Sequence, residues 1–198
     1  MTMPDPRRES DTALSGGRRD AERNRARILD VAREVLAEDG SASLNSIAKK
    51  AGVGAGTLYR HFPNRESLVL AVYRTEVQRL VDLAPTLLDE HSPPDSLRRW
   101  FERLATQIRL KRGLGDALTA TNHDKVTGET YGPVIEAITL MLRAGESDGS
   151  LRPGLDPDDV LLMMGCVWRV PAGSDGLRQA DRLLDLIIDG LRAGPTPG

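Results

Sequence analysis

The sequence predicts an all-α protein, with three short helices near its N-terminal end and a larger helical part after them. Two observations carry this prediction. After residue 20, apolar residues recur three and four positions apart, which is the period of one helix face. Cap residues, glycines and prolines divide this pattern into helix-sized segments, and no segment shows the alternation of apolar and polar residues typical of a strand.

Composition and charge indicate a globular chain with a basic end. The 198 residues are 39% hydrophobic, enough for a small module joined to a larger domain. Residues 1–65 hold twelve Lys and Arg against nine Asp and Glu, whereas residues 66–198 hold fifteen against twenty. A basic end on an acidic chain fits a nucleic-acid module. Cys166 is the single cysteine, which excludes an internal disulfide and a cysteine-rich metal site.

Residues 1–20 are rich in Arg, Asp, Ser, Gly and Pro, so we expect a flexible basic tail. They contain no apolar segment, which argues against a signal peptide, and no apolar run of the chain approaches the length that spans a membrane. A cytoplasmic protein is therefore expected.

The first two helices are each predicted from an apolar stripe. The first helix stops at Gly40, and the hydroxyl of Ser43 can cap the second. Gly52 suits the left-handed turn that follows. The stripes consist of Ile28, Val31, Ala32, Val35 and Leu36 in the first helix and of Leu44, Ile47, Ala48 and Ala51 in the second.

A third, very short helix follows the turn and ends before Pro63. Leu58 and Phe62 share one of its faces and can pack on the first two helices, without which so short a helix would not be stable. The opposite side carries Gly56, Thr57, Tyr59 and Arg60. This arrangement predicts a helix-turn-helix whose outer face enters a groove of DNA, where backbone N–H groups beside small residues can meet a phosphate.

The larger part is predicted as further helices separated by breakers. Asn64 can cap a fourth helix that ends close to Pro85, and Ser92 with Pro93 begins a fifth. Asp156 can cap a helix that ends before Pro171. After a break around residue 113, the sequence predicts a short segment at 116–120, a loop at 121–130, and helices at 131–143, 157–170 and 177–192.

Four segments form one pattern: SLNSIA at 43–48, AGV at 51–53, GTLYRHF at 56–62 and RESL at 65–68. The pattern closely resembles the N-terminal DNA-binding domain of the TetR family of bacterial transcriptional regulators. The resemblance covers roughly residues 23–70, and the all-helical remainder is also what that family has. It implies a helix-turn-helix DNA-binding domain at 21–66 and a helical ligand-binding and dimerisation domain at 67–193, after the tail at 1–20.

The resemblance implies DNA contacts from three helices. The second helix would meet phosphates and sometimes a base, the third would enter the groove, and the start of the fourth would grip a phosphate. An arginine arm at 18–27 would either reach the minor groove or backbone, or be a solvated tail and helix face. The residues implied are Ser43, Asn45, Ser46, Ala55, Gly56, Thr57, Tyr59, Arg60, His61 and Arg65, with Arg25 from the arm.

Two positions depart from the family's pattern. Gly54 stands where the family often has serine, so a side-chain cap of the third helix is missing. Ala55 stands where a polar base reader is common, so we expect apolar contact with a thymine methyl there. Specificity would then rest more on Asn45, Tyr59 and the arm.

The larger part indicates neither an enzyme nor a metal or cofactor site. It has no Gly-rich phosphate loop, no paired histidine ligands and no nucleophile elbow. A metal site formed by His123, Asp124 and Glu129 is conceivable, but a solvated loop explains these residues better.

Two segments near the C-terminal end are apolar on more than one side, although a helix needs only one stripe to face its own core. The surplus predicts either all-round burial in one domain or an interface with a second copy. The TetR resemblance implies a homodimer through the last two helices, with recognition helices roughly 34 Å apart on a palindrome. The interface residues expected are Leu161, Met164, Leu183, Leu184, Ile187 and Leu191.

The resemblance also implies a pocket for a small-molecule effector among the middle helices, lined by apolar side chains and a few polar groups. The candidates are Trp100, Phe101, Leu104, Ile108, Leu118, Asn122, His123, Tyr131, Met141, Met163 and Trp168. A plain core requires the same residue types at the same spacing, so both interpretations stay open.

These expectations together predict a homodimeric repressor that leaves a palindromic operator when a small apolar ligand binds. An all-helical adaptor for a protein partner and a helical enzyme acting on a small molecule are the alternatives. The adaptor predicts no salt-dependent affinity for DNA. The enzyme lacks an acid, a base or a nucleophile in the sequence. Activation and repression are not separated by the sequence.

Overall fold

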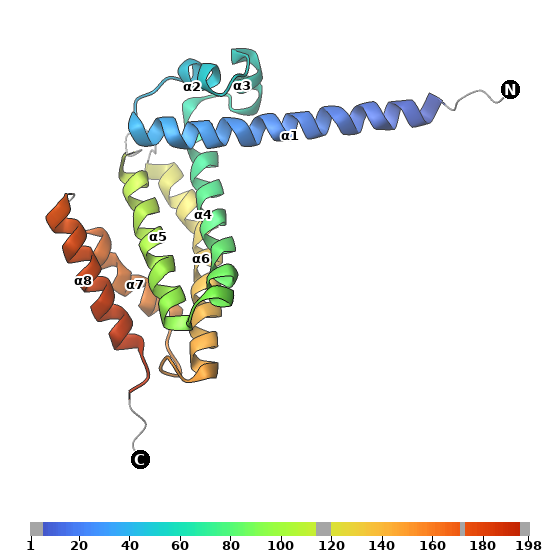
Figure 1. Ribbon diagram of the computed structural model, residues 1–198. Coiled ribbons are helices and arrows are strands. Elements are labelled where there is room, and N and C mark those ends of the chain that lie inside the picture. The colour runs from blue at the N-terminus through green and yellow to red at the C-terminus, as the bar shows by residue number, and fades with distance from the viewer. Residues whose placement is uncertain (1–5, 114–119, 171–172, 195–198) are drawn as a thin grey trace. The chain divides into compact units, whose positions relative to one another are not determined.

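The computed structural model describes the backbone of residues 6–113, 120–170 and 173–194, and the chain divides into two compact units (Figure 1). Unit 1 comprises Met1–Val72 and unit 2 comprises Tyr73–Gly198. The boundary between the two units lies within the fourth helix, between Val72 and Tyr73. The described residues form helices and contain no strand, which confirms the all-α class.

Unit 1 consists of three helices and the first turns of a fourth: α1 (Pro6–Glu38), α2 (Leu44–Lys50), α3 (Ala55–His61) and α4 (Arg65–Glu90). The predicted apolar stripes supply its core. Burying one large apolar side chain contributes about 1.5–3 kcal/mol, so a unit of this size depends on few residues. The buried large side chains are those of Ile28, Leu29, Leu36, Leu44, Ile47, Leu58, Phe62, Leu68, Val69 and Val72.

The first helix is much longer than its apolar stripe. Residues 6–20, for which the sequence predicts a flexible tail, are helical as far back as Pro6. Proline is well tolerated at the first helical position, and no later proline interrupts the helix before Gly40. The prediction failed because periodicity detects a helix by its apolar face, and this stretch has none.

Unit 2 contains the rest of α4 together with α5 (Pro93–Gly113), α6 (Ala120–Asp148), α7 (Pro157–Trp168) and α8 (Ser174–Leu191). Two predicted caps are confirmed. The Asp95 N–H donates to the Ser92 hydroxyl at 3.4 Å, and the Asp158 N–H donates to the Asp156 carboxylate at 2.8 Å. The largest fully buried side chains of this unit are those of Leu97, Trp100, Phe101, Ile138, Met141, Leu151 and Met164.

The fourth helix does not end at Pro85, as the sequence predicts, but continues to Glu90. Proline removes the donor to the carbonyl four residues earlier, here that of Val81, so packing along the rest of the helix has to offset the loss. Here α5 supplies two buried donors to α4, one on each side of the proline. The Trp100 indole N–H donates to the Leu80 carbonyl at 2.7 Å, and the Ser96 hydroxyl donates to the Leu87 carbonyl at 2.9 Å.

The sixth helix begins at Ala120, so residues 121–130 are helical rather than the predicted loop. Their sequence is polar and contains Gly128, which hid the helix from a pattern that looks for apolar spacing. The predicted segment at 116–120 lies outside the described residues except for Ala120.

The connection between α6 and α7 is tied to the end of α8. The Arg152 N–H donates to the Leu191 carbonyl at 2.9 Å, and the Ala193 N–H donates to the Ser150 carbonyl at 3.1 Å. These bonds flank the bridge between Leu151 and Arg192. Within the described parts of the chain, no helix is both long enough and apolar enough to cross a membrane.

Candidate nucleic-acid interface

The second helix presents a compact set of hydroxyl and amide groups to solvent. Ser43 is its N-cap, as predicted, and its hydroxyl accepts the Ser46 N–H at 3.1 Å. The Ser46 hydroxyl in turn donates to the Ser43 carbonyl at 2.7 Å. These two side chains and that of Asn45 are exposed, while Leu44 and Ile47 hold the helix to the core. The start of α2 is therefore polar on the outside and fixed from the inside.

The turn between α2 and α3 has the geometry that its glycines indicate. Gly52 has a φ of +64°, in the left-handed region that favours glycine. Gly54 is the N-cap of α3, and its carbonyl accepts the Thr57 and Leu58 N–H groups at 2.9 and 3.1 Å. No side chain caps this helix, which confirms the expected consequence of glycine at this position.

The third helix has one buried face and one open face, as the sequence predicts. Leu58 is fully buried and Phe62 is 2% exposed, whereas Tyr59 on the opposite side is 44% exposed. Ala55, Gly56 and Arg60 are also exposed, and Thr57 and His61 are half-buried. A tyrosine so exposed in a chain that is 4% aromatic is a side chain available to a partner.

The arginines of the predicted arm at 18–27 make different contacts. The Arg25 guanidinium lies 5.5 Å from the centre of the Phe62 ring, so it braces α1 against the end of α3 by a cation–π contact. Arg23 pairs with Asp20 at 2.6 Å, and Arg27 donates to Asn24 at 3.0 Å. The side chains of Arg18 and Arg19 lie outside the described residues. The arm's contact to DNA stays a prediction.

Arg65 makes contacts that sequence reasoning missed. Its two terminal nitrogens donate to the carbonyls of Gly40 and Ala42, in the connection between α1 and α2. The residue is half-buried and stands at the first position of α4. No local pattern could reveal these bonds, because they join residues 23 and 25 positions apart. The phosphate contact implied by the resemblance stays untested.

In unit 2, α7 and α8 carry an apolar surface open to solvent. Leu162 is 77% exposed and Leu186 is 69% exposed. Three of the predicted interface residues, Met164, Leu184 and Leu191, instead belong to the protomer's own core, since each is at most 2% exposed. We define the α7–α8 apolar surface as Leu162, Met163 and Leu186, with the half-buried Leu161, Leu183 and Ile187.

The predicted pocket residues differ widely in exposure. Trp100, Phe101 and Met141 are fully buried, and Leu104 is buried. Tyr131 and Met163 are exposed, and the Tyr131 hydroxyl donates to Asp158, which raises the pKa of the tyrosine. Leu118 and the side chains of Ile108, Asn122, His123 and Trp168 lie outside the described residues.

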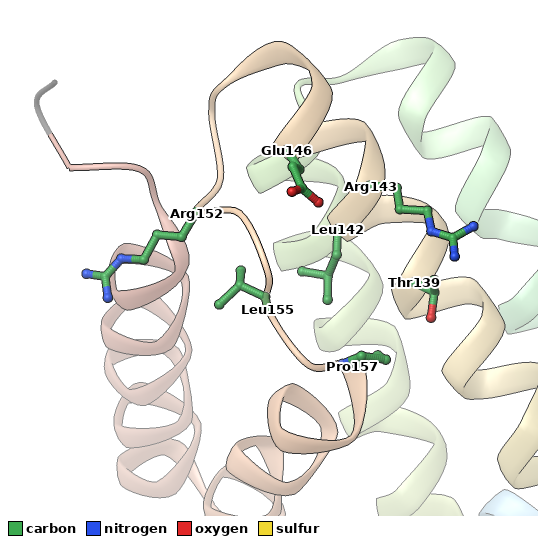
Figure 2. Close-up of a pocket in the computed structure, with 7 residues that line it drawn as sticks. All are labelled: Thr139, Leu142, Arg143, Glu146, Arg152, Leu155 and Pro157. Atoms are coloured by element: carbon green, nitrogen blue, oxygen red, sulfur yellow. The ribbon is translucent and has the colours of Figure 1, made fainter.

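A cavity of about 200 Å³ opens between the end of α6, the α6–α7 connection and the start of α7. In Figure 2, Leu142 of α6 and Leu155 of the α6–α7 connection lie between these two segments. The guanidinium groups of Arg143 and Arg152 point to opposite sides. Its lining residues are Thr139, Leu142, Arg143, Glu146, Arg152, Leu155 and Pro157. None of the predicted pocket residues lines this cavity.

A short helix held by its apolar face and open on its polar face, after a capped helix and a left-handed glycine turn, defines a helix-turn-helix DNA-binding protein. Comparison with known proteins identifies the family of this chain. Residues 28–72 match the family described as bacterial regulatory proteins, tetR family. Residues 92–193 match the family described as transcriptional regulator SbtR-like, C-terminal domain. The chain belongs to the TetR family of transcriptional regulators, which are DNA-binding regulators and not enzymes.

Solved structures agree over both units. The TetR transcriptional regulator SCO0520 from Streptomyces coelicolor is 38% identical, with a TM-score of 0.75 over 86% of this chain and 99% of that one. A TetR transcription regulatory protein from Mycobacterium vanbaalenii is 32% identical, with a TM-score of 0.71 over 89% and 99%. An HTH-type transcriptional regulator of Staphylococcus aureus is 36% identical over 76 residues, which span 37% of this chain and 41% of that relative.

Proposed function

We propose that this regulator is a repressor that binds a palindromic operator as a homodimer and leaves it when a small apolar ligand binds. The observation that carries the DNA-binding half of this proposal is the division of α3 between buried Leu58 and Phe62 and exposed Tyr59 and Arg60. A helix anchored from behind can enter the major groove without rearranging its own core.

The proposed contacts follow from the chemistry of the exposed groups. Ser43 and Ser46 at the start of α2 are suited to phosphate oxygens, and Asn45 is suited to a phosphate or an adenine edge. Tyr59 and Arg60 offer hydrogen-bond donors from α3. Ala55 and Gly56, which carry at most a methyl group, let α3 approach closely and favour contact with a thymine methyl.

The α7–α8 apolar surface supports the homodimer. Exposed leucines on neighbouring helices of one protomer would be covered by the same surface of a second copy, as a two-fold axis requires. The resulting pair would hold two α3 helices about 34 Å apart, one turn of B-DNA. Because its partner is chromosomal DNA, the proposal also assigns the protein to the cytoplasm.

The ligand would act by preferring one conformation of the dimer. An effector shifts an equilibrium only by the difference between its affinities for the two states. The fourth helix contributes residues to both units, so its movement can change the spacing of the two reading helices. The buried aromatic and methionine side chains around Trp100 and Met141 are the proposed apolar lining.

Selection of DNA fragments tests this function. The purified full-length protein is mixed with genomic fragments of its source organism at physiological salt, and the bound fragments are sequenced. We expect enrichment of one short palindrome and a steep decrease of affinity with salt, because several phosphates are contacted. Enrichment of no sequence by well-folded, ligand-free protein would refute the proposal and favour a protein-binding adaptor.

A further inference from the structure

The connection between α1 and α2 is held by groups from its own chain segment and from α4. Within the segment, the Asp39 carboxylate accepts the Ser41 N–H at 2.8 Å and the Ser41 hydroxyl at 2.6 Å. The Ala42 N–H donates to the Asp39 carbonyl at 3.1 Å. From outside the segment, the Arg65 guanidinium donates to the carbonyls of Gly40 and Ala42. One planar group thus spans two carbonyls of the connection.

Charge favours the same arrangement. Carbonyls that follow a helix C-terminus carry the negative end of the helix dipole, and a guanidinium is well suited to them. The Asp39 side chain adds a negative charge at this point, and its pKa is lowered mainly by the hydrogen bonds from Ser41 and partly by the charge of Arg65. Arg65 therefore lies where the end of α1 and Asp39 attract a cation.

The position of the connection determines the position of α2. Ala42 is buried and immediately precedes Ser43, the N-cap of α2. The exposed groups of Asn45 and Ser46 follow within the first turn. A contact that fixes the Ala42 carbonyl thus fixes the first turn of the helix that faces DNA.

We infer that Arg65 is a positioning residue, which holds the first turn of α2 in its DNA-binding geometry by bridging the Gly40 and Ala42 carbonyls. It acts through the α1–α2 connection rather than by contact with a phosphate. The inference rests on the DNA-binding role of unit 1 and extends it. Since Arg65 is also the first residue of α4, the bridge links the start of α4 to the start of α2.

The substitution Arg65→Lys distinguishes a positioning role from a phosphate contact. A lysine at position 65 keeps the positive charge, so a residue that gripped a phosphate would keep most of its effect. The ammonium group cannot reproduce a planar fork that reaches two carbonyls at once. Arg65→Lys therefore removes the bridge and keeps the charge, whereas Arg65→Gln removes both.

The first experiment is hydrogen exchange on the free full-length protein, without DNA. We expect the backbone amides of residues 41–47 to exchange about tenfold faster in Arg65→Lys than in the wild type, because the bridge no longer restrains local opening. Arg60→Lys is the matched control, since Arg60 is an exposed arginine of α3, and its exchange should be unchanged. Equally faster exchange across all of unit 1 would indicate a general loss of stability and would overturn the positioning role. Unchanged exchange at 41–47 would overturn it.

The second experiment measures affinity for the selected operator over a range of salt concentrations. We expect Arg65→Lys and Arg65→Gln to bind about tenfold more weakly than the wild type, a difference of about 1.4 kcal/mol. Their salt slopes should equal that of the wild type. A phosphate contact predicts the opposite result: wild-type affinity in the lysine variant, and a slope smaller by about 0.9 in the glutamine variant.

The two experiments distinguish a failure of the proposed repressor function from a failure of the positioning role of Arg65. If the protein selects no operator, the proposed repressor function fails, but the exchange of residues 41–47 still tests the bridge. If an operator is found and the lysine variant shows wild-type exchange and affinity, the positioning role of Arg65 fails while the repressor function stands.

Discussion

Replacing Trp100 by phenylalanine should destabilise unit 2 well beyond the loss of ring volume. Trp100 is fully buried, and its indole N–H donates to the Leu80 carbonyl at 2.7 Å, five residues before Pro85. Phenylalanine cannot donate, so the Leu80 carbonyl loses its partner from α5, a hydrogen bond that contributes about 0.5–1.5 kcal/mol. The smaller ring leaves unfilled space, for which about 1 kcal/mol is added. We therefore expect the free energy of unfolding to fall by about 1.5–2.5 kcal/mol.

The assay is urea unfolding followed by far-UV circular dichroism, with the protein concentration held constant because the proposed dimerisation would shift the apparent stability. Phe101→Leu is the control. Phe101 is equally buried and meets the Trp100 ring edge-on at 5.6 Å, but it has no polar group to lose, so we expect about 1–2 kcal/mol. If Trp100→Phe costs no more than the control, the indole hydrogen bond contributes nothing to the stability of unit 2.

Three further predictions concern other parts of the chain. Tyr59→Ala should weaken operator binding by about 1 kcal/mol or more in a mobility-shift assay, without changing the oligomeric state; unchanged affinity would remove Tyr59 from the reading surface. Leu186→Glu should yield monomers in analytical ultracentrifugation, since a buried unpaired carboxylate is costly at an interface; an intact dimer would move the interface elsewhere. Gly145→Ala should destabilise the protein by about 1–3 kcal/mol in a thermal melt, because the added Cβ would collide with the Leu151 side chain. Gly128→Ala, in the same helix and with nothing near its Cβ, is the matched control and should not destabilise.

Local chemistry made much of the fold predictable. A cap depends on a side chain within three residues of the amide it accepts, so the sequence alone located Ser43, Ser92 and Asp156 as helix starts. A left-handed turn depends on one residue, and Gly52 has that conformation. The two faces of α3 also follow from spacing alone, which is why the exposed position of Tyr59 was predicted correctly.

Long-range contacts explain what could not be predicted. On either side of Pro85, α4 is held by Trp100 and Ser96, which belong to the next helix along the chain. The bonds of Arg65 reach 23 and 25 residues back, so the sequence could not reveal them, and the resemblance implied a phosphate contact there. A polar helix without an apolar stripe, such as residues 6–20, cannot be predicted from the spacing of apolar residues.

The α7–α8 apolar surface shows a more specific limit of periodicity. Two apolar faces on one helix indicate two buried surfaces, but spacing cannot tell which face turns toward the helix's own domain. The sequence assigned Met164, Leu184 and Leu191 to the interface, and the structure buries all three within the protomer. Leu162 and Leu186 lie on the other faces of the same helices and stay exposed. The number of apolar faces was thus available from the sequence, whereas their assignment required the packing of α5 and α6 against them.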